Sequence, residues 1–310
     1  MKHKHWTLAL ASLGAISLGS VVYAEEQAMS QVLTAVSSTT LSGYVDTGAA
    51  WKMGGMGGGE LPGRFNDGAS KMQGFNLNVA GLTVEKPLSE EDLWAAGYRL
   101  DLLFGPDAVG YNPVTGSNAE LAIKQAYVDL LVPVGNGLDV KAGVFNTIIG
   151  YESFESYANP NWGRSYGWVI EPTQHTGLLA TYQLTEAISA SGGVANTWYP
   201  SVDGRAGTTR GDDFGEGYLT YLASVSVTAP DSWGALSGSS WSIGIVGGDS
   251  GAVTDAAGNV VDDGMNTTSL YTGVNVLTGL EGLSVVAVSL KQNKDASYDD
   301  ICAAMKSASE

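Results

Sequence analysis

The chain places two carboxylates and a guanidinium close together in one segment. Glu152, Glu155 and Arg164 lie between residues 151 and 168, a stretch without apolar periodicity that is broken by Asn-Pro-Asn at 159–161. Two carboxylates could serve as the acid and the nucleophile of a glycosidase. Nothing else in the sequence supports hydrolysis, so we interpret the segment as a charged loop rather than a catalytic site.

The other arrangements that enzymes and metal sites use are missing from the sequence. The single cysteine, Cys302, excludes an internal disulfide and a cysteine-based zinc site, and two of the three histidines are His3 and His5. The Gly-x-Ser-x-Gly spacing of serine hydrolases does not occur. Segment 255–264 could bind Ca²⁺, but it lacks EF-hand spacing and fits a solvated acidic turn better. We predict no enzymatic activity, no cofactor and no metal.

Charged residues also recur at regular positions on both sides of a tight turn. Every second residue is apolar from 126 to 132, and the alternation resumes after the turn at 133–137, which predicts two strands with one polar and one apolar face. The turn places Asp129 nearly opposite Lys141 on the polar face. Lys124 falls in phase with the apolar face, so we expect its ammonium group to reach out to the rim of the sheet.

The polar faces of the predicted strands carry a set of charged residues that would meet water inside a closed sheet. The alternative is that these charges pair with one another and merely fill the wall. In either arrangement they avoid the cost of about 2–4 kcal/mol that a Lys facing lipid at mid-depth would incur. The residues of this set are Arg99, Asp101, Asp129, Lys141 and His175.

The apolar faces end in aromatic residues. Trp94 and Phe104 lie on one face of a long strand, and with a tilt of about 40° they would stand about 25 Å apart along a membrane normal. This distance matches the apolar band of an outer-membrane barrel with aromatic side chains at both edges. The residues predicted to form such a lipid-facing girdle are Trp94, Phe104, Tyr182, Trp198 and Trp241.

The lengths of the connections predict how the strands are arranged. Long segments (53–67, 105–118, 151–168, 200–215, 249–266) alternate with shorter turns (86–92, 133–137, 185–186, 229–239, 278–282), as in outer-membrane barrels. Many glycines and only 15% charged residues also suit an all-β chain. The alternation within 75–85 changes phase near Gly81, which predicts a β-bulge. We predict an antiparallel, up-and-down transmembrane β-barrel of about 11–12 strands.

The ends of the chain differ from the segment between them. Lys2 and Lys4 precede an apolar stretch at 7–22 and a cleavage site at 22–24, so residues 1–24 are a predicted export signal and 25–38 a polar leader. No later run reaches the roughly 18 apolar residues that a spanning helix needs. Residues 39–295 are the predicted barrel and 296–310 a polar tail. Because bacterial barrels have even strand numbers, we expect either a C-terminally incomplete chain with a non-native tail or a poor last strand at 298–305.

Several short motifs are similar to those of a known family. They are Leu41-Ser-Gly-Tyr-Val-Asp46, Ile123-Lys-Gln-Ala-Tyr-Val128, Pro133-Val-Gly-Asn-Gly137, Gly150-Tyr-Glu152, Asn159-Pro-Asn161 with Arg164-Ser-Tyr166, and His175-Thr-Gly177. Over residues 39–295 the chain resembles the outer-membrane β-barrel porin family called OmpL-like.

The resemblance implies a porin of the bacterial outer membrane through which small hydrophilic solutes diffuse. In porins an early long loop often folds into the lumen, so Glu152, Glu155 and Arg164 would form the pore constriction, and the charged set on the polar faces would line the pore. The implied partners are outer-membrane lipid and the solutes, a trimer is compatible with the family, and the net charge of −17 excludes nucleic acid. The alternative is a soluble, secreted, glycine-rich β protein that binds glycans or surfaces.

Overall fold

The chain is described by a computed structural model that covers residues 38–51, 73–89, 92–111, 121–159, 163–198, 200, 202–203, 219–249, 253–254, 260–262, 266–276 and 286–292. The predicted export signal, most of the leader and the polar tail lie outside these residues. The chain divides into residues 1–39 and 40–310, and all strands belong to the second unit. No helix of the described residues is long and apolar enough to cross a membrane.

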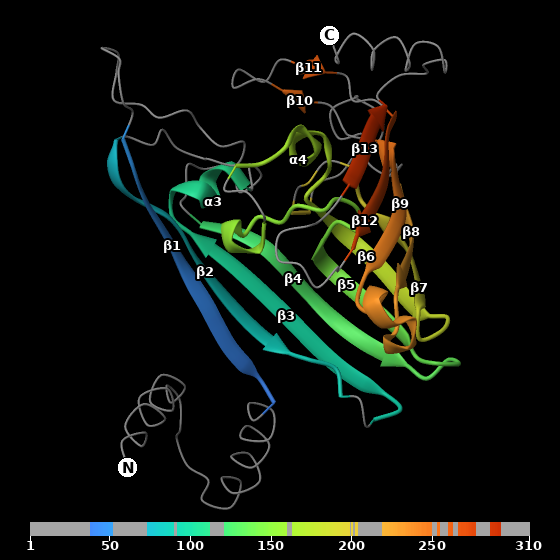
Figure 1. Ribbon diagram of the computed structural model, residues 1–310. Coiled ribbons are helices and arrows are strands. Elements are labelled where there is room, and N and C mark those ends of the chain that lie inside the picture. The colour runs from blue at the N-terminus through green and yellow to red at the C-terminus, as the bar shows by residue number, and fades with distance from the viewer. Residues whose placement is uncertain are drawn as a thin grey trace, which may run out of the picture. The chain divides into compact units, whose positions relative to one another are not determined.

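Eleven strands of the described residues form one sheet, in which each strand is antiparallel to its neighbours. The strands follow one another in the order of the chain, except that a separate hairpin is inserted after β9 (Figure 1). The all-β, up-and-down prediction is therefore confirmed. β1 and β13 are the two edges of the sheet, which is not closed over the described residues. The strands are β1 (Thr40–Ala50), β2 (Gly74–Lys86), β3 (Ala95–Phe104), β4 (Leu121–Val132), β5 (Leu138–Asn146), β6 (Gln174–Gln183), β7 (Ile188–Ala195), β8 (Thr220–Thr228), β9 (Ser240–Asp249), β12 (Asn266–Asn275) and β13 (Val286–Gln292).

The connections sort by length as the sequence predicts. The turns after β2, β4, β6, β8 and β12 are shorter than the segments after β1, β3, β5, β7 and β9. The short turn after β8 contains η3 (Asp231–Leu236), and the predicted acidic loop after β9 contains the hairpin β10 (Val253–Thr254) and β11 (Val260–Asp262). The long segments contain α3 (Pro106–Tyr111), η2 (Ser156–Ala158) and α4 (Tyr166–Ile170). Because neighbouring strands are antiparallel, all long segments leave the same end of the sheet.

The two faces of the sheet have opposite chemistry. Apolar side chains on the outer face are exposed, for example Trp94 at 69%, together with Val128, Leu178, Ile243 and others. On the inner face, buried polar side chains such as Asp101, which is 4% exposed, lie beside two clusters of buried apolar side chains. A water-soluble protein has the reverse arrangement, with apolar side chains inside and charges outside.

Two β-bulges rotate polar residues onto the inner face. On β2, Asp46 pairs with Val79 and Thr47 with Leu77, so Asn78 is an extra residue, and its amide donates to Asp46 at 2.8 Å. The predicted bulge in this strand therefore exists, but at Asn78 rather than near Gly81. An extra residue in one strand shifts the phase of the alternation that follows it.

The second bulge corrects the expected position of Lys124. Asp101 pairs with Gln125 and Leu102 pairs with Ile123, so Lys124 is the extra residue on β4. Its side chain is buried on the inner face, with 6% of the residue exposed. The prediction that it reaches the rim from the apolar face is wrong, because strict alternation does not hold across a bulge.

Candidate functional site

The loop between β5 and β6, residues 147–173, lies against the inner face of the sheet (Figure 1). Ile149 is buried in a cluster with Leu222 of β8 and Val246 of β9. Phe154 is buried in a second cluster with Val79 of β2 and Leu103 of β3. The same loop therefore touches strands from both halves of the sheet and spans the space that the sheet curves around.

Two contacts fasten this loop to the first strands. The ammonium group of Lys124 on β4 forms an ion pair with the carboxylate of Glu155, and both side chains are largely buried. The ring of Tyr157 in η2 contacts the ring of Tyr44 on β1 edge-to-face, with 5.2 Å between centroids. Glu155 thus lies inside the sheet as predicted, but its charge is neutralised by a lysine that we expected on the other face.

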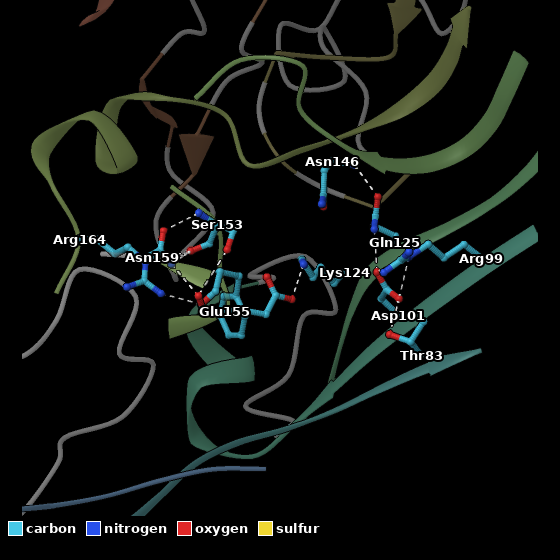
Figure 2. A network of polar contacts seen from close by, with 11 residues as sticks. Thr83, Arg99, Asp101, Lys124, Gln125, Asn146, Ser153, Glu155, Asn159 and Arg164 are labelled. Atoms are coloured by element: carbon cyan, nitrogen blue, oxygen red, sulfur yellow. Dashed lines mark hydrogen bonds and ion pairs between the residues drawn. The ribbon is translucent and has the colours of Figure 1, made fainter. Parts of the chain in front are cut away.

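Arg164 holds the loop in its fold. Its guanidinium group donates to the carbonyl oxygen of Ser153 at 3.0 Å (Figure 2) and to that of Phe154 at 2.7 Å. The group also lies 5.7 Å from the centre of the Trp168 ring. The residue is 6% exposed. Arginine suits this position because its planar group donates several hydrogen bonds in fixed directions. Its observed contacts are those of a brace within the loop.

Asn159 contributes a brace that sequence reasoning missed. Its amide nitrogen donates to the carbonyl oxygens of Ser153 at 2.9 Å and Glu155 at 2.6 Å, and its side-chain oxygen accepts from the Ser153 amide at 2.9 Å. The Asn-Pro-Asn sequence was a usable signal, because asparagine side chains commonly replace backbone partners in turns.

Glu152 and Glu171 border a cavity of about 210 Å³ beneath the loop. Glu152 accepts hydrogen bonds from the backbone amide of Ser165 at 3.0 Å and from its hydroxyl. Burial, and then the nearby carboxylate of Glu152, raise the pKa of Glu171 to about 7. Glu171 could not be selected from its sequence position, because only the fold brings residues 152 and 171 together.

The expected inner-face charges on β3 form a compact network. Asp101 accepts from Arg99 Nε at 2.9 Å, from the Thr83 hydroxyl at 2.8 Å and from the Gln125 amide at 2.7 Å (Figure 2). Arg99 also forms an ion pair with Glu85 at 3.2 Å. The two predicted residues therefore lie on the predicted face, where they pair with each other.

The charges on β4 and β5 are paired as well. Asp129 lies directly opposite Lys141 in the register, as the turn length predicts, with 4.0 Å between the charged groups. The same ammonium group lies 3.7 Å from Asp139 and 5.4 Å from the centre of the Tyr127 ring. His175 also points inward, but it is fully buried beside Thr147, with 3.2 Å between Nε2 and the hydroxyl oxygen.

Four of the five aromatic residues predicted to form the girdle have side chains that are exposed or half-buried on the outer face or at its rim. Trp94, Phe104 and Trp241 are exposed, and Tyr182 is half-buried near the 133–137 turn, where its hydroxyl accepts from the Asn136 amide. Trp198 is the exception. It is buried on the inside, and its indole nitrogen donates to the Ser269 hydroxyl at 3.2 Å. The outward prediction fails there because β7 ends at Ala195, so alternation no longer applies three residues later.

No group of three or more His, Cys, Asp or Glu side chains within the described residues could hold a metal ion. The charged side chains of the inner face form local ion pairs, and hydrogen bonds within the loop 147–173 hold its conformation.

Comparison with known proteins gives one match. The sequence model of a family described as putative beta-barrel porin-2, OmpL-like, matches residues 38–288. This range spans the sheet from before β1 into β13 and includes the whole loop 147–173. No curated protein and no solved structure matches the chain.

Proposed function

Since the chain belongs to the OmpL-like beta-barrel porin-2 family, we propose that it forms a channel of the bacterial outer membrane through which small hydrophilic solutes diffuse. The observation that carries the proposal is the inversion of the two faces of the sheet. Exposed apolar side chains cover the outside, and buried charges and amides lie inside beside two apolar clusters that pack against the loop. In a bilayer the outer face would contact lipid and the inner face would surround water.

The size of the exposed apolar surface distinguishes this function from that of a soluble, secreted β protein. Large apolar residues are exposed on β1, β2, β3, β4, β6, β8, β9 and β12. An exposed apolar surface that continues around a whole sheet marks a lipid or protein interface in a soluble environment. Outer-membrane lipid is therefore the proposed partner of this face.

Loop 147–173 would set the width of the channel. It reaches from the inner side of β8 and β9 to the inner side of β2 and β3, and it is fastened at Glu155 and braced by Arg164. A loop held by buried contacts narrows a lumen permanently rather than swinging through it. The charges on the walls are mostly paired, so we propose that solutes are sorted first by size.

The test is direct. The full chain, expressed with its own export signal, should appear in the outer-membrane fraction as a band whose gel mobility changes on boiling. The purified protein should produce discrete conductance steps in a planar bilayer. Recovery in the soluble periplasmic fraction without conductance would refute the channel and favour the soluble glycan-binding alternative.

A further inference from the structure

Gly244 lies on the inner face of β9, at the point where loop 147–173 reaches this wall. In the register it pairs with Ser224 of β8 and with Tyr271 of β12, and it is buried. An added Cβ at this position would lie 2.7 Å from Cγ2 of Ile149 in the loop. Carbon atoms in contact are normally about 3.5–4.0 Å apart. The loop therefore already fills the space that a side chain at position 244 would occupy.

Ile149 seals the loop against this wall. Its side chain is 3% exposed and packs in one cluster with Leu222, Val246 and Tyr271, which are buried as well. Isoleucine is branched at Cβ and stiff at χ1, so a clash at Cγ2 would be relieved mainly by movement of the loop backbone. The distance between the loop and β9 therefore depends on the absence of a side chain at Gly244.

Glycine is an unfavourable residue within a strand, because it loses more backbone freedom than other residues and packs no side chain. Where it occurs in a strand, it often marks the close approach of another segment. Gly244 shows such an approach, and Gly247 on the same strand does not. Three positions along a strand lead to the opposite face, and an added Cβ at Gly247 would lie no closer than 3.4 Å to a neighbour, the hydroxyl oxygen of Thr268.

We propose that Gly244 determines the size limit of the channel by providing the seat for Ile149. The inference rests on the proposed function and specifies which position of the wall controls it. With Ile149 seated, the buried side chains of Ile149, Leu222 and Val246 leave almost no accessible surface between the loop and the wall, so solutes cannot pass on this side. Gly244 is a positioning residue, because it acts through Ile149 and not by contact with the solute.

Gly244→Val fills the seat and should lift the loop from the wall. Overpacking of this kind should shift the equilibrium between the seated and the lifted loop about ten- to hundredfold towards the lifted loop. Single-channel conductance should rise, and polyethylene glycols too large to enter the wild-type channel should now reduce the current. Gly247→Val, the matched control on the outer face of β9, should leave both unchanged. Gly244→Ala adds one carbon at the same place, should act in the same direction, and serves if the valine variant does not fold.

A compensating change separates the seat from general damage to the sheet. Ile149→Ala makes room for the new side chain, so Gly244→Val combined with Ile149→Ala should restore the wild-type conductance and the exclusion of the larger polyethylene glycols. A valine that merely distorts β9 would not be rescued by a change in the loop, and absence of rescue would overturn the seat. Gel mobility before and after boiling shows that each variant is folded.

Trypsin cleavage separates this inference from the channel itself, because Arg164 of the same loop is buried while the loop is seated. A conducting protein in which Gly244→Val keeps the wild-type conductance and size limit would overturn the seat and leave the channel intact. Faster cleavage after Arg164 in Gly244→Val, reversed in the double variant of a protein that never conducts, would support the seat and refute the channel. A protein without conductance whose cleavage does not respond would overturn both.

Discussion

The ion pair between Lys124 and Glu155 offers the sharpest test of how loop 147–173 is held. We expect Lys124→Met to free the loop from β4. The two side chains are only 8% and 13% exposed. Removing one partner of a buried pair leaves the other charge desolvated and costs about 3–5 kcal/mol. At 1.4 kcal/mol per factor of ten, the equilibrium between docked and released loop should shift by about two to three and a half orders of magnitude.

The other contacts of the loop are individually weaker than this loss. Burial of the Phe154 side chain contributes about 1.5–3 kcal/mol, and the edge-to-face contact of Tyr157 with Tyr44 adds about 0.5–1.5 kcal/mol. Loss of the ion pair should therefore populate the released loop to a measurable extent. The predicted signs are a larger single-channel conductance and faster trypsin cleavage after Arg164, which is buried while the loop is docked.

Two variants control for general damage. Lys124→Met combined with Glu155→Met removes both charges at similar volume, and such replacements are often neutral or stabilising, so conductance and cleavage should return towards wild type. Lys141→Met removes a partly exposed wall charge whose partners lie at 3.7 and 4.0 Å, and it should leave the loop docked. If Lys124→Met keeps the wild-type conductance and cleavage rate, the ion pair does not anchor the loop and the reasoning is refuted.

Four further predictions follow from the same contacts. Phe154→Ala removes the buried side chain and also leaves a cavity, which together should cost about 3–5 kcal/mol and make the open-channel current noisier. A quiet current would mean that the cluster does not hold the loop. Arg164→Lys keeps the charge and the trypsin site but loses the planar donor group, so cleavage at position 164 should accelerate; an unchanged rate would contradict the bracing role. Val225→Lys on the outer face of β8 should impair folding into lipid vesicles by about 2–4 kcal/mol, while Ser226→Lys on the inner face should not; equal effects in a gel-mobility assay would contradict the assignment of faces. Between pH 6 and 8, cation preference measured from reversal potentials should increase as Glu171 loses its proton, and Glu171→Gln should flatten this dependence; an unchanged slope would exclude Glu171.

Residues far apart in sequence show what could be predicted and what could not. The Asp129–Lys141 register followed from turn length, because a short turn fixes which residues of a hairpin face each other. The partner of Glu155 could not be predicted in this way, because Lys124 lies 31 positions away and the orientation of its side chain depends on a bulge. An alternating pattern of apolar and polar residues does not show where a bulge inserts an extra residue into a strand, unless a charged residue falls in the apolar phase. Lys124 is such a charge: its position in the apolar phase predicted a side chain that reaches the rim, whereas the structure explains it by a bulge.

The folded loop was the second limit of sequence reasoning. The charged residues of the loop can be recognised in the sequence. The prediction of a single constriction, however, gave Glu152, Glu155 and Arg164 the same role. In the structure the three side chains have different roles. Lys124 neutralises Glu155, the guanidinium group of Arg164 donates hydrogen bonds to backbone carbonyl oxygens, and Glu152 borders the cavity. Which carboxylate is neutralised depends on tertiary packing, and local sequence does not contain that information.

The bulge at Lys124 connects the fold to the proposed selectivity. Without the extra residue, Lys124 would face outward and Glu155 would have no cation beside it. The extra residue brings one positive charge inside, where it neutralises the carboxylate that fastens the loop, whereas Glu152 and Glu171 border the cavity. The wall charges at Arg99, Asp101, Asp129 and Lys141 are paired along the strands, so their fields largely cancel in the lumen. Charge selectivity should therefore reside in the loop, and neutralising a wall pair such as Asp129–Lys141 should change the reversal potential less than Glu171→Gln alone.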